Sequence, residues 1–196
     1  MKTHILVSSI LLALFSTATL AQGTAATVQR DVNQQTRIEQ GLQSGSLNTK
    51  EAGRLEREES HVDRLQAKAL QDGKLTPAER QRLDHAQDKV SHDIAEAKHN
   101  GVTGNPDSAS SKRMQADVQR NINQEKRIEQ GVQSGALTNR EVGNLERAQA
   151  RTDRREAVAA RDGHVGAHEQ ARIQHQKNRH SEEIFDKKHN GRHRKG

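Results

Sequence analysis

The chain contains no cysteine, tryptophan or tyrosine, and only two proline and two phenylalanine residues among its 196 positions. Without cysteine it can form neither a disulfide nor a thiolate metal site, so nothing covalent reinforces the fold. Hydrophobic residues make up 30% of the chain and aromatic residues 1%. This composition excludes a large dry core, and we expect narrow apolar seams between helices in its place.

Sequence motifs typical of enzymes are also missing. The chain has no G-x-S-x-G, no H-E-x-x-H and no glycine loop of the kind that binds phosphate. A thin core leaves little room for the desolvated pocket that shifts the pKa of a catalytic group. The sequence therefore predicts a protein that is not an enzyme.

The start of the chain has the pattern of a secretory signal peptide. Lys2 precedes an apolar run from Ile5 to Phe15, and small residues lead up to Ala21. This pattern predicts a signal peptide over residues 1–21, cleavage after Ala21 and a periplasmic or secreted mature protein. The apolar run is too short for a membrane-spanning helix, which needs about 20 residues.

What the chain does contain is an internal repeat. Residues 28–101 align with residues 118–191 at a constant offset of 90, with 34 identities over 74 positions. The stretch R-I-E-Q-G-L-Q-S-G-S-L-N-T-K-E-A-G-R-L-E-R, at 37–57, returns almost unchanged at 127–147. The chain therefore holds two copies of one structural unit.

Strong helix formers dominate both copies, and runs of β-branched residues are absent, which predicts an all-α fold. We expect three helices in each copy, at 27–43, 49–71 and 77–99 and at 114–133, 139–161 and 167–189. The predicted organisation is two tandem three-helix units, at 22–99 and 113–189, joined by a flexible linker at 100–112 and followed by a basic disordered tail at 190–196.

The predicted breaks between helices share one pattern. A glycine that can adopt the left-handed conformation ends each helix, at Gly45, Gly73, Gly135 and Gly163. Capping boxes then start three of the next helices, with the pairs Asn48 and Glu51, Thr76 and Glu79, and Thr138 and Glu141. The fourth start, Gly166 with Glu169, lacks the capping side chain.

One break partly resembles an EF-hand loop. The stretch D-G-K-L-T-P-A-E at 72–79 matches the second half of such a loop, but Lys68 and Leu70 stand where the first acidic ligands belong. Calcium takes 6–8 oxygen ligands, and this loop is too poor in them. Helix capping explains the same residues, so a calcium-modulated helical module is only a third hypothesis.

Histidine supplies the candidate metal ligands. His85, His92 and His99 recur every seven residues, on the face opposite the apolar stripe of their helix. His164 and His168 are four residues apart, and so are His189 and His193. This spacing would let the two imidazoles of a pair share one metal ion. The candidate ligands are His85, His92, His99, His164, His168, His175, His189 and His193. The leading hypothesis is a non-enzymatic interaction or stress-type protein that binds copper, nickel or zinc ions weakly through these exposed histidines.

Charge suggests an alternative function. Residues 22–111 hold 12 Lys and Arg against 14 Asp and Glu, a net charge of −2, whereas residues 112–196 hold 19 against 12, a net charge of +7. The alternative is therefore binding of a polyanion, such as lipopolysaccharide, a cell-wall polymer or nucleic acid, through the basic second repeat. An envelope protein partner or an oligomer would also fit the thin core.

The pattern Q-G-(L/V)-x-S-G-x-L-(T/N)-x-x-E-x-x-x-L-E, together with the break D-G-(K/H)-(L/V)-x-x-x-E, covers both copies. It resembles a group of short exported proteobacterial proteins of uncharacterised function. The resemblance implies a location in the cell envelope and implies nothing about activity.

Overall fold

The computed structural model describes the backbone of residues 15–192 and the side chains of residues 23–192. Its helices are α1 (Phe15–Ser44), α2 (Thr49–Ala69), α3 (Pro77–His99), α4 (Ala109–Gln133), α5 (Asn139–Ala159) and α6 (Ala167–His189), with one 3-10 turn at Ala160–Asp162. No strand occurs between residues 15 and 192, so the predicted all-α fold is confirmed. None of these helices combines the length and the apolar character that crossing a membrane requires.

Two predicted helix starts differ from the structure. α1 begins at Phe15 and runs through the predicted cleavage site after Ala21, while residues 1–14 of the predicted signal peptide lie outside the described part. α4 begins at Ala109, inside the predicted linker, because the Ser108 side chain accepts a hydrogen bond from the amide of Ser111 and caps the helix.

The helix ends follow the predicted chemistry. The four glycines at the breaks have φ between 74° and 88°, and all three predicted capping boxes form. At the fourth start the Glu169 carboxylate accepts a hydrogen bond from the Gly166 amide at 2.9 Å, without a side-chain cap in return.

The repeated Q-G-(L/V)-x-S-G-x-L motif makes one compact helix end in each copy. The amide of Leu47 donates to the carbonyl of Gly41 at 2.9 Å, and Leu137 donates to Gly131 in the same way. A Cβ atom at Gly41 would lie 2.5 Å from Leu47 Cδ1. The glycine is therefore needed because the leucine folds back over it to seal the end of the bundle.

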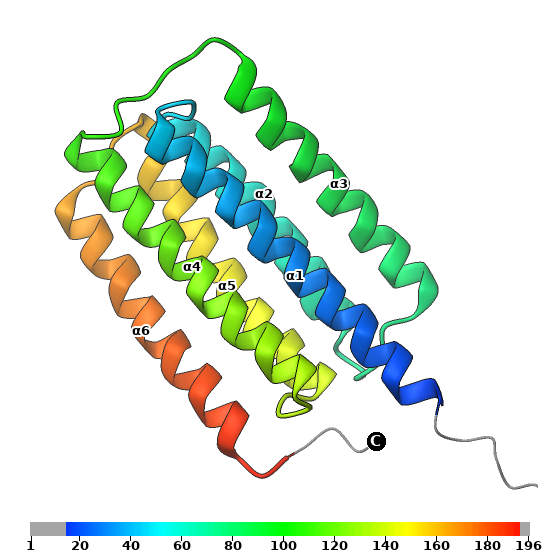
Figure 1. The fold of residues 1–196 in the computed structure, drawn as a ribbon. Coiled ribbons are helices and arrows are strands. Elements are labelled where there is room, and N and C mark those ends of the chain that lie inside the picture. Colours follow the sequence, from blue (N-terminus) through cyan, green and yellow to red (C-terminus); the bar gives the residue numbers. More distant parts are fainter. Residues whose placement is uncertain (1–14, 193–196) are drawn as a thin grey trace, which may run out of the picture.

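The centre of the molecule is a bundle of α1, α2, α4 and α5, with α3 and α6 on its two flanks (Figure 1). α2 and α5 run antiparallel in close contact. Ser60 of α2 donates a hydrogen bond to the carbonyl of Ala150, its own counterpart in the second copy, at 2.8 Å. Gly53 lies against Ala160 at one end of this pair, and Gly143 lies against Leu70 at the other. The two copies are thus related by an approximate twofold axis that passes near Ser60.

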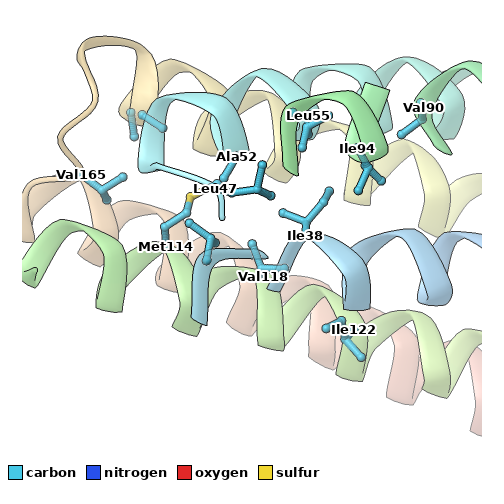
Figure 2. Close-up of a cluster of buried hydrophobic side chains, with 14 of the residues drawn as sticks. Ile38, Leu47, Ala52, Leu55, Val90, Ile94, Met114, Val118, Ile122 and Val165 are labelled. Atoms are coloured by element: carbon cyan, nitrogen blue, oxygen red, sulfur yellow. The ribbon is translucent and has the colours of Figure 1, made fainter. Parts of the chain in front are cut away.

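Two apolar clusters hold the bundle together, and each draws on both copies. In the first cluster Ile38 and Leu47 gather beside Met114 and Val118 (Figure 2). The second cluster is its counterpart and contains Val28, Leu75, Ile128, Leu137, Val142, Leu145 and Ile184 among others. The prediction of two three-helix units joined by a flexible linker is therefore not confirmed, because helices of both copies share each cluster.

The connection between α3 and α4 lies against the end of the bundle. The amide of Gly104 donates to the carbonyl of Gly45 at 2.8 Å. A Cβ atom at Gly104 would lie 2.5 Å from the carbonyl oxygen of Leu47. The connection therefore packs directly on the turn between α1 and α2.

The close approach of α2 and α5 gives a prediction about Gly53. A Cβ atom there would lie 2.5 Å from the Cβ of Ala160. We expect Gly53→Ala to lower the free energy of unfolding by about 1–3 kcal/mol, because overpacking a close helix contact costs that much. Urea denaturation followed by circular dichroism measures the change.

Gly23→Ala in α1 is the matched control. The atoms nearest to its Cβ belong to the flexible end of the Arg80 side chain, which can move aside. Alanine favours a helix over glycine by about 1 kcal/mol. We expect this control to be neutral or stabilising, and equal effects at both sites would contradict the packing account.

Candidate functional site

The interior between the two apolar clusters is acidic. Nine carboxyl groups there are at most 2% exposed. They belong to Asp31, Glu56, Glu59, Asp63, Asp117, Glu125, Glu146, Asp153 and Glu156. The only lysine or arginine buried to the same degree among the described residues is Lys177, whose side chain is 0% exposed. Buried charge is costly unless it is paired, so this layer is the strongest candidate for a functional site.

One group of these carboxylates surrounds Lys177, and we call it the Lys177 cluster. The ligand atoms of Glu56, Asp153 and Glu156 all lie within 4.8 Å of one another. Lys177 Nζ lies 2.5 Å from Glu156 Oε1. The Asn121 side chain accepts a hydrogen bond from Lys177 and donates one to Glu156 at 3.0 Å. An ammonium group of the chain itself therefore neutralises part of this cluster.

A second group lies around Gln87, and we call it the Gln87 cluster. The ligand atoms of Asp31, Glu125 and Glu146 also lie within 4.8 Å of one another, and all three residues are buried. The Gln87 amide donates to Asp31 Oδ1 at 2.5 Å and to the carbonyl of Thr27 at 3.1 Å. Both carboxylate oxygens of Glu125 and both of Glu146 lack a hydrogen-bond partner among the described residues.

The two clusters occupy equivalent places in the repeat. At the offset of 90, the matching pairs are Asp31 and Asn121, Glu125 and Gln35, Glu146 and Glu56, Asp63 and Asp153, Gln66 and Glu156, and Gln87 and Lys177. Three substitutions separate the clusters most clearly. The Lys177 cluster has the amides Asn121 and Gln35 and the amine of Lys177. At the equivalent positions the Gln87 cluster has the carboxylates Asp31 and Glu125 and the amide Gln87. The Gln87 cluster thus has carboxylates but no cation of its own.

Burial and mutual repulsion raise the pKa of eight carboxyl groups in this layer. Burial is the largest cause in each case, and it raises the pKa of Asp31, Asp117 and Asp153 to about 7. It raises the pKa of Glu56, Glu59, Asp63, Glu125 and Glu146 well above the ordinary range, and neighbouring carboxylates raise each further. The pKa values of Asp31, Asp117 and Asp153 therefore lie near neutral pH, because the charged form of a buried carboxyl group is disfavoured.

The predicted histidine ligands lie elsewhere. His85, His92 and His99 on α3 are exposed, as are His164, His168, His175 and His189. His193 lies outside the described residues. The ring nitrogen atoms of His99 and His189 lie 2.7 Å from the carbonyl oxygens of Ala95 and Phe185, in the last turns of their helices. Metal binding by these side chains stays a prediction.

Of the seven predicted histidines that the structure describes, one, His92, belongs to a group that could hold a metal ion. His92 lies with Asp93 and Glu96 on the outer side of α3, with ligand atoms within 4.8 Å of one another. His164 precedes α6, so the spacing of four between His164 and His168 does not place both on one helical turn.

Helix capping occupies the carboxylates of the break that partly resembles an EF-hand. Asp72 Oδ1 accepts a hydrogen bond from the Lys74 amide at 2.8 Å, and Glu79 Oε2 accepts one from the Thr76 amide at 3.0 Å.

His180 is buried and stands where the first copy has Val90 in its apolar seam. Burial lowers the pKa of His180 to about 3, and the positive charges of Lys177, Arg151 and Arg127 lower it further.

Comparison of the chain with known protein families, curated proteins and solved structures gave no match. The interior carboxylates are therefore interpreted from their geometry alone.

The sequence analysis missed the acidic layer, although a signal was present. Glu56, Glu59, Asp63 and Gln66 follow one another at steps of three and four, which is the spacing of residues that face a neighbouring helix. Glu146, Gln149, Asp153 and Glu156 repeat this row in the second copy. A polar row kept at core spacing in both copies indicates a polar interior.

The raised pKa values predict an unusual dependence of stability on pH. A carboxyl group with a raised folded-state pKa gives stability that is fully present below its unfolded-state pKa and lost as pH rises through the folded one. A shift from 3.8 to about 7, as for Asp31, corresponds to about 4 kcal/mol. With chelator present, we expect urea denaturation to give a free energy of unfolding several kcal/mol lower at pH 8 than at pH 5.

Glu59→Gln tests the cause, because Gln149 is the natural counterpart of Glu59. Removing this titrating group should reduce the loss of unfolding free energy between pH 5 and pH 8. The control Asp186→Asn, at an exposed position of α6, should leave that loss unchanged. The lowered pKa of His180 has the opposite effect, because it makes the protein less stable at acidic pH. This one histidine acts against eight carboxyl groups with raised pKa values. Stability that rises from pH 5 to pH 8 would show that the buried carboxyl groups do not titrate as described.

Proposed function

We propose that this protein is an exported, non-enzymatic helical repeat protein that binds one divalent cation inside its four-helix bundle. The site is the Gln87 cluster, with Asp31, Glu125 and Glu146 as the main ligands. The observation that carries the proposal is the contrast between the two equivalent clusters. One encloses the ammonium group of Lys177, and the other brings three buried carboxylates together with no cation from the chain.

A bound cation would meet needs that the chain itself does not meet. Within the part of the chain that the structure describes, the four oxygens of Glu125 and Glu146 have no hydrogen-bond partner, and neither does Oδ2 of Asp31. The side-chain amide of Gln66 also has no hydrogen-bond partner among the described residues. Gln66 is the counterpart of Glu156, which belongs to the Lys177 cluster. Unsatisfied buried polar atoms cost about 1–3 kcal/mol each, more when charged. A divalent ion would satisfy several of them at once.

The ligand chemistry favours a hard cation. Every candidate ligand atom in this cluster is an oxygen, and carboxylate oxygens suit calcium, manganese and magnesium rather than copper or nickel. Magnesium gives up its bound waters reluctantly, and the cluster is buried. Three carboxylates offer up to six oxygens, and Asp63 and Gln66 could add more, which suits calcium or manganese.

The amino-terminal pattern supports export, as the sequence predicted. The proposal changes the expected ligands from exposed histidines to buried carboxylates. Since the ligands come from α1, α4 and α5, the ion would join the two copies. Such binding is coupled to folding, because the unfolded chain does not assemble the site.

The test compares the wild-type protein with Asp31→Asn/Glu125→Gln, a double variant that copies Asn121 and Gln35 from the Lys177 cluster. At pH 7.5, after removal of metal by chelation, we expect wild type to bind about one Ca²⁺ or Mn²⁺ per chain by calorimetry. At 100-fold the dissociation constant, the ion should stabilise the protein by about 2.7 kcal/mol. The double variant should bind none and should be more stable than wild type in chelator.

Two further variants separate this site from others. Gln87→Lys, which copies Lys177, should also remove the ion, because an ammonium group would occupy its place. His92→Ala should leave binding of Ca²⁺ or Mn²⁺ unchanged. An ion count that persists in the double variant, with helicity intact by circular dichroism, would overturn the proposal, and loss of binding in His92→Ala would move the site to the surface of α3.

A further inference from the structure

A groove lined by arginine runs between α5 and α6 on the outside of the second copy. It consists of two adjoining cavities of about 510 and 270 Å³ that share Arg151 and Arg155. Arg154 and Arg172 line the larger cavity and Arg179 lines the smaller one. Five arginine residues therefore line these two adjoining cavities.

These arginines are not engaged elsewhere in the protein. None of the five has an ion pair or a side-chain hydrogen bond with any residue of the described part of the chain. The two acidic residues of the groove are both occupied, since Glu169 caps α6 and Glu183 pairs with Lys187 at 3.4 Å. His180, at the base of the smaller cavity, has its pKa lowered to about 3 and adds no charge at neutral pH. The groove therefore carries a concentrated positive charge.

The first copy provides an internal comparison. At the position of Arg155 it has Leu65, which packs against the second apolar cluster and fills the corresponding space between α2 and α3. The cavity there is only about 100 Å³. Arg151 corresponds to His61, and Val158, which is 64% exposed, corresponds to Lys68. At these equivalent positions the second copy therefore has the larger cavity and more arginine residues.

We propose that this groove binds a linear ligand with several phosphate groups. Guanidinium groups bind phosphate oxygens in pairs of parallel hydrogen bonds, and arginine is the preferred residue for such contacts. Successive arginines along α5 and α6 present these groups in a row, which matches phosphates repeated along a chain. No phenylalanine, tyrosine or tryptophan lines the groove, so we expect the ligand to be held through its phosphates.

The test measures binding of tripolyphosphate to the full protein by calorimetry, with inorganic phosphate as the single-anion comparison. We expect tripolyphosphate to bind at least about tenfold more tightly than phosphate, because several guanidinium contacts act together. Arg155→Leu, which copies Leu65, should weaken tripolyphosphate binding by at least about tenfold and fold normally, since the side chain is exposed.

The matched control uses two equivalent positions. Arg172→Gln, in the groove, should weaken binding, and Arg82→Gln, its counterpart on α3, should not. Equal effects of these two substitutions, or equal affinity for phosphate and tripolyphosphate, would overturn the proposal. Binding to vesicles of anionic phospholipid without binding of tripolyphosphate would overturn it as well, in favour of a membrane surface. The interior cation site plays no part in the measurement, so the two proposals can fail independently.

Discussion

The balance of buried charge is the constraint on which the rest of this structure depends. Nine carboxyl groups lie in the interior of the bundle, and Lys177 is the single buried ammonium group that faces them in the described residues. Carboxylates of this kind cannot all ionise together, because each loses its hydration and repels the others. The folded bundle therefore favours the protonated form of these groups. Burial of the carboxyl groups thus links the stability of the bundle to pH.

The two apolar clusters supply the stability that offsets the cost of the buried carboxyl groups. Each cluster includes a leucine that folds back at a helix end, Leu47 in the first and Leu137 in the second. These two contacts close helix ends, while Gly53 and Gly143, near the two ends of the α2–α5 pair, let these helices approach closely. The packing around the polar layer keeps it buried.

Local sequence features predicted the helices well, because their causes are local. The start of α3 at Pro77 and the ends at Gly45 and Gly135 depend on capping groups within a few residues. The arrangement of the helices depends on contacts between residues about 90 positions apart, such as Ser60 with Ala150, which no local pattern encodes. The sequence likewise identified His85 and His92 as exposed, yet it gave no direct sign that Asp31 and Glu125 would meet Glu146.

The contact between Ser60 and Ala150 has a consequence for how such a molecule can arise. Equivalent residues of two copies meet only near a twofold axis, so a protein with a single copy would meet a second molecule of itself across the same surface. In that symmetric dimer both interior clusters would have to be identical. Within one polypeptide this requirement does not hold, which permits lysine at position 177 in one half and glutamine at position 87 in the other.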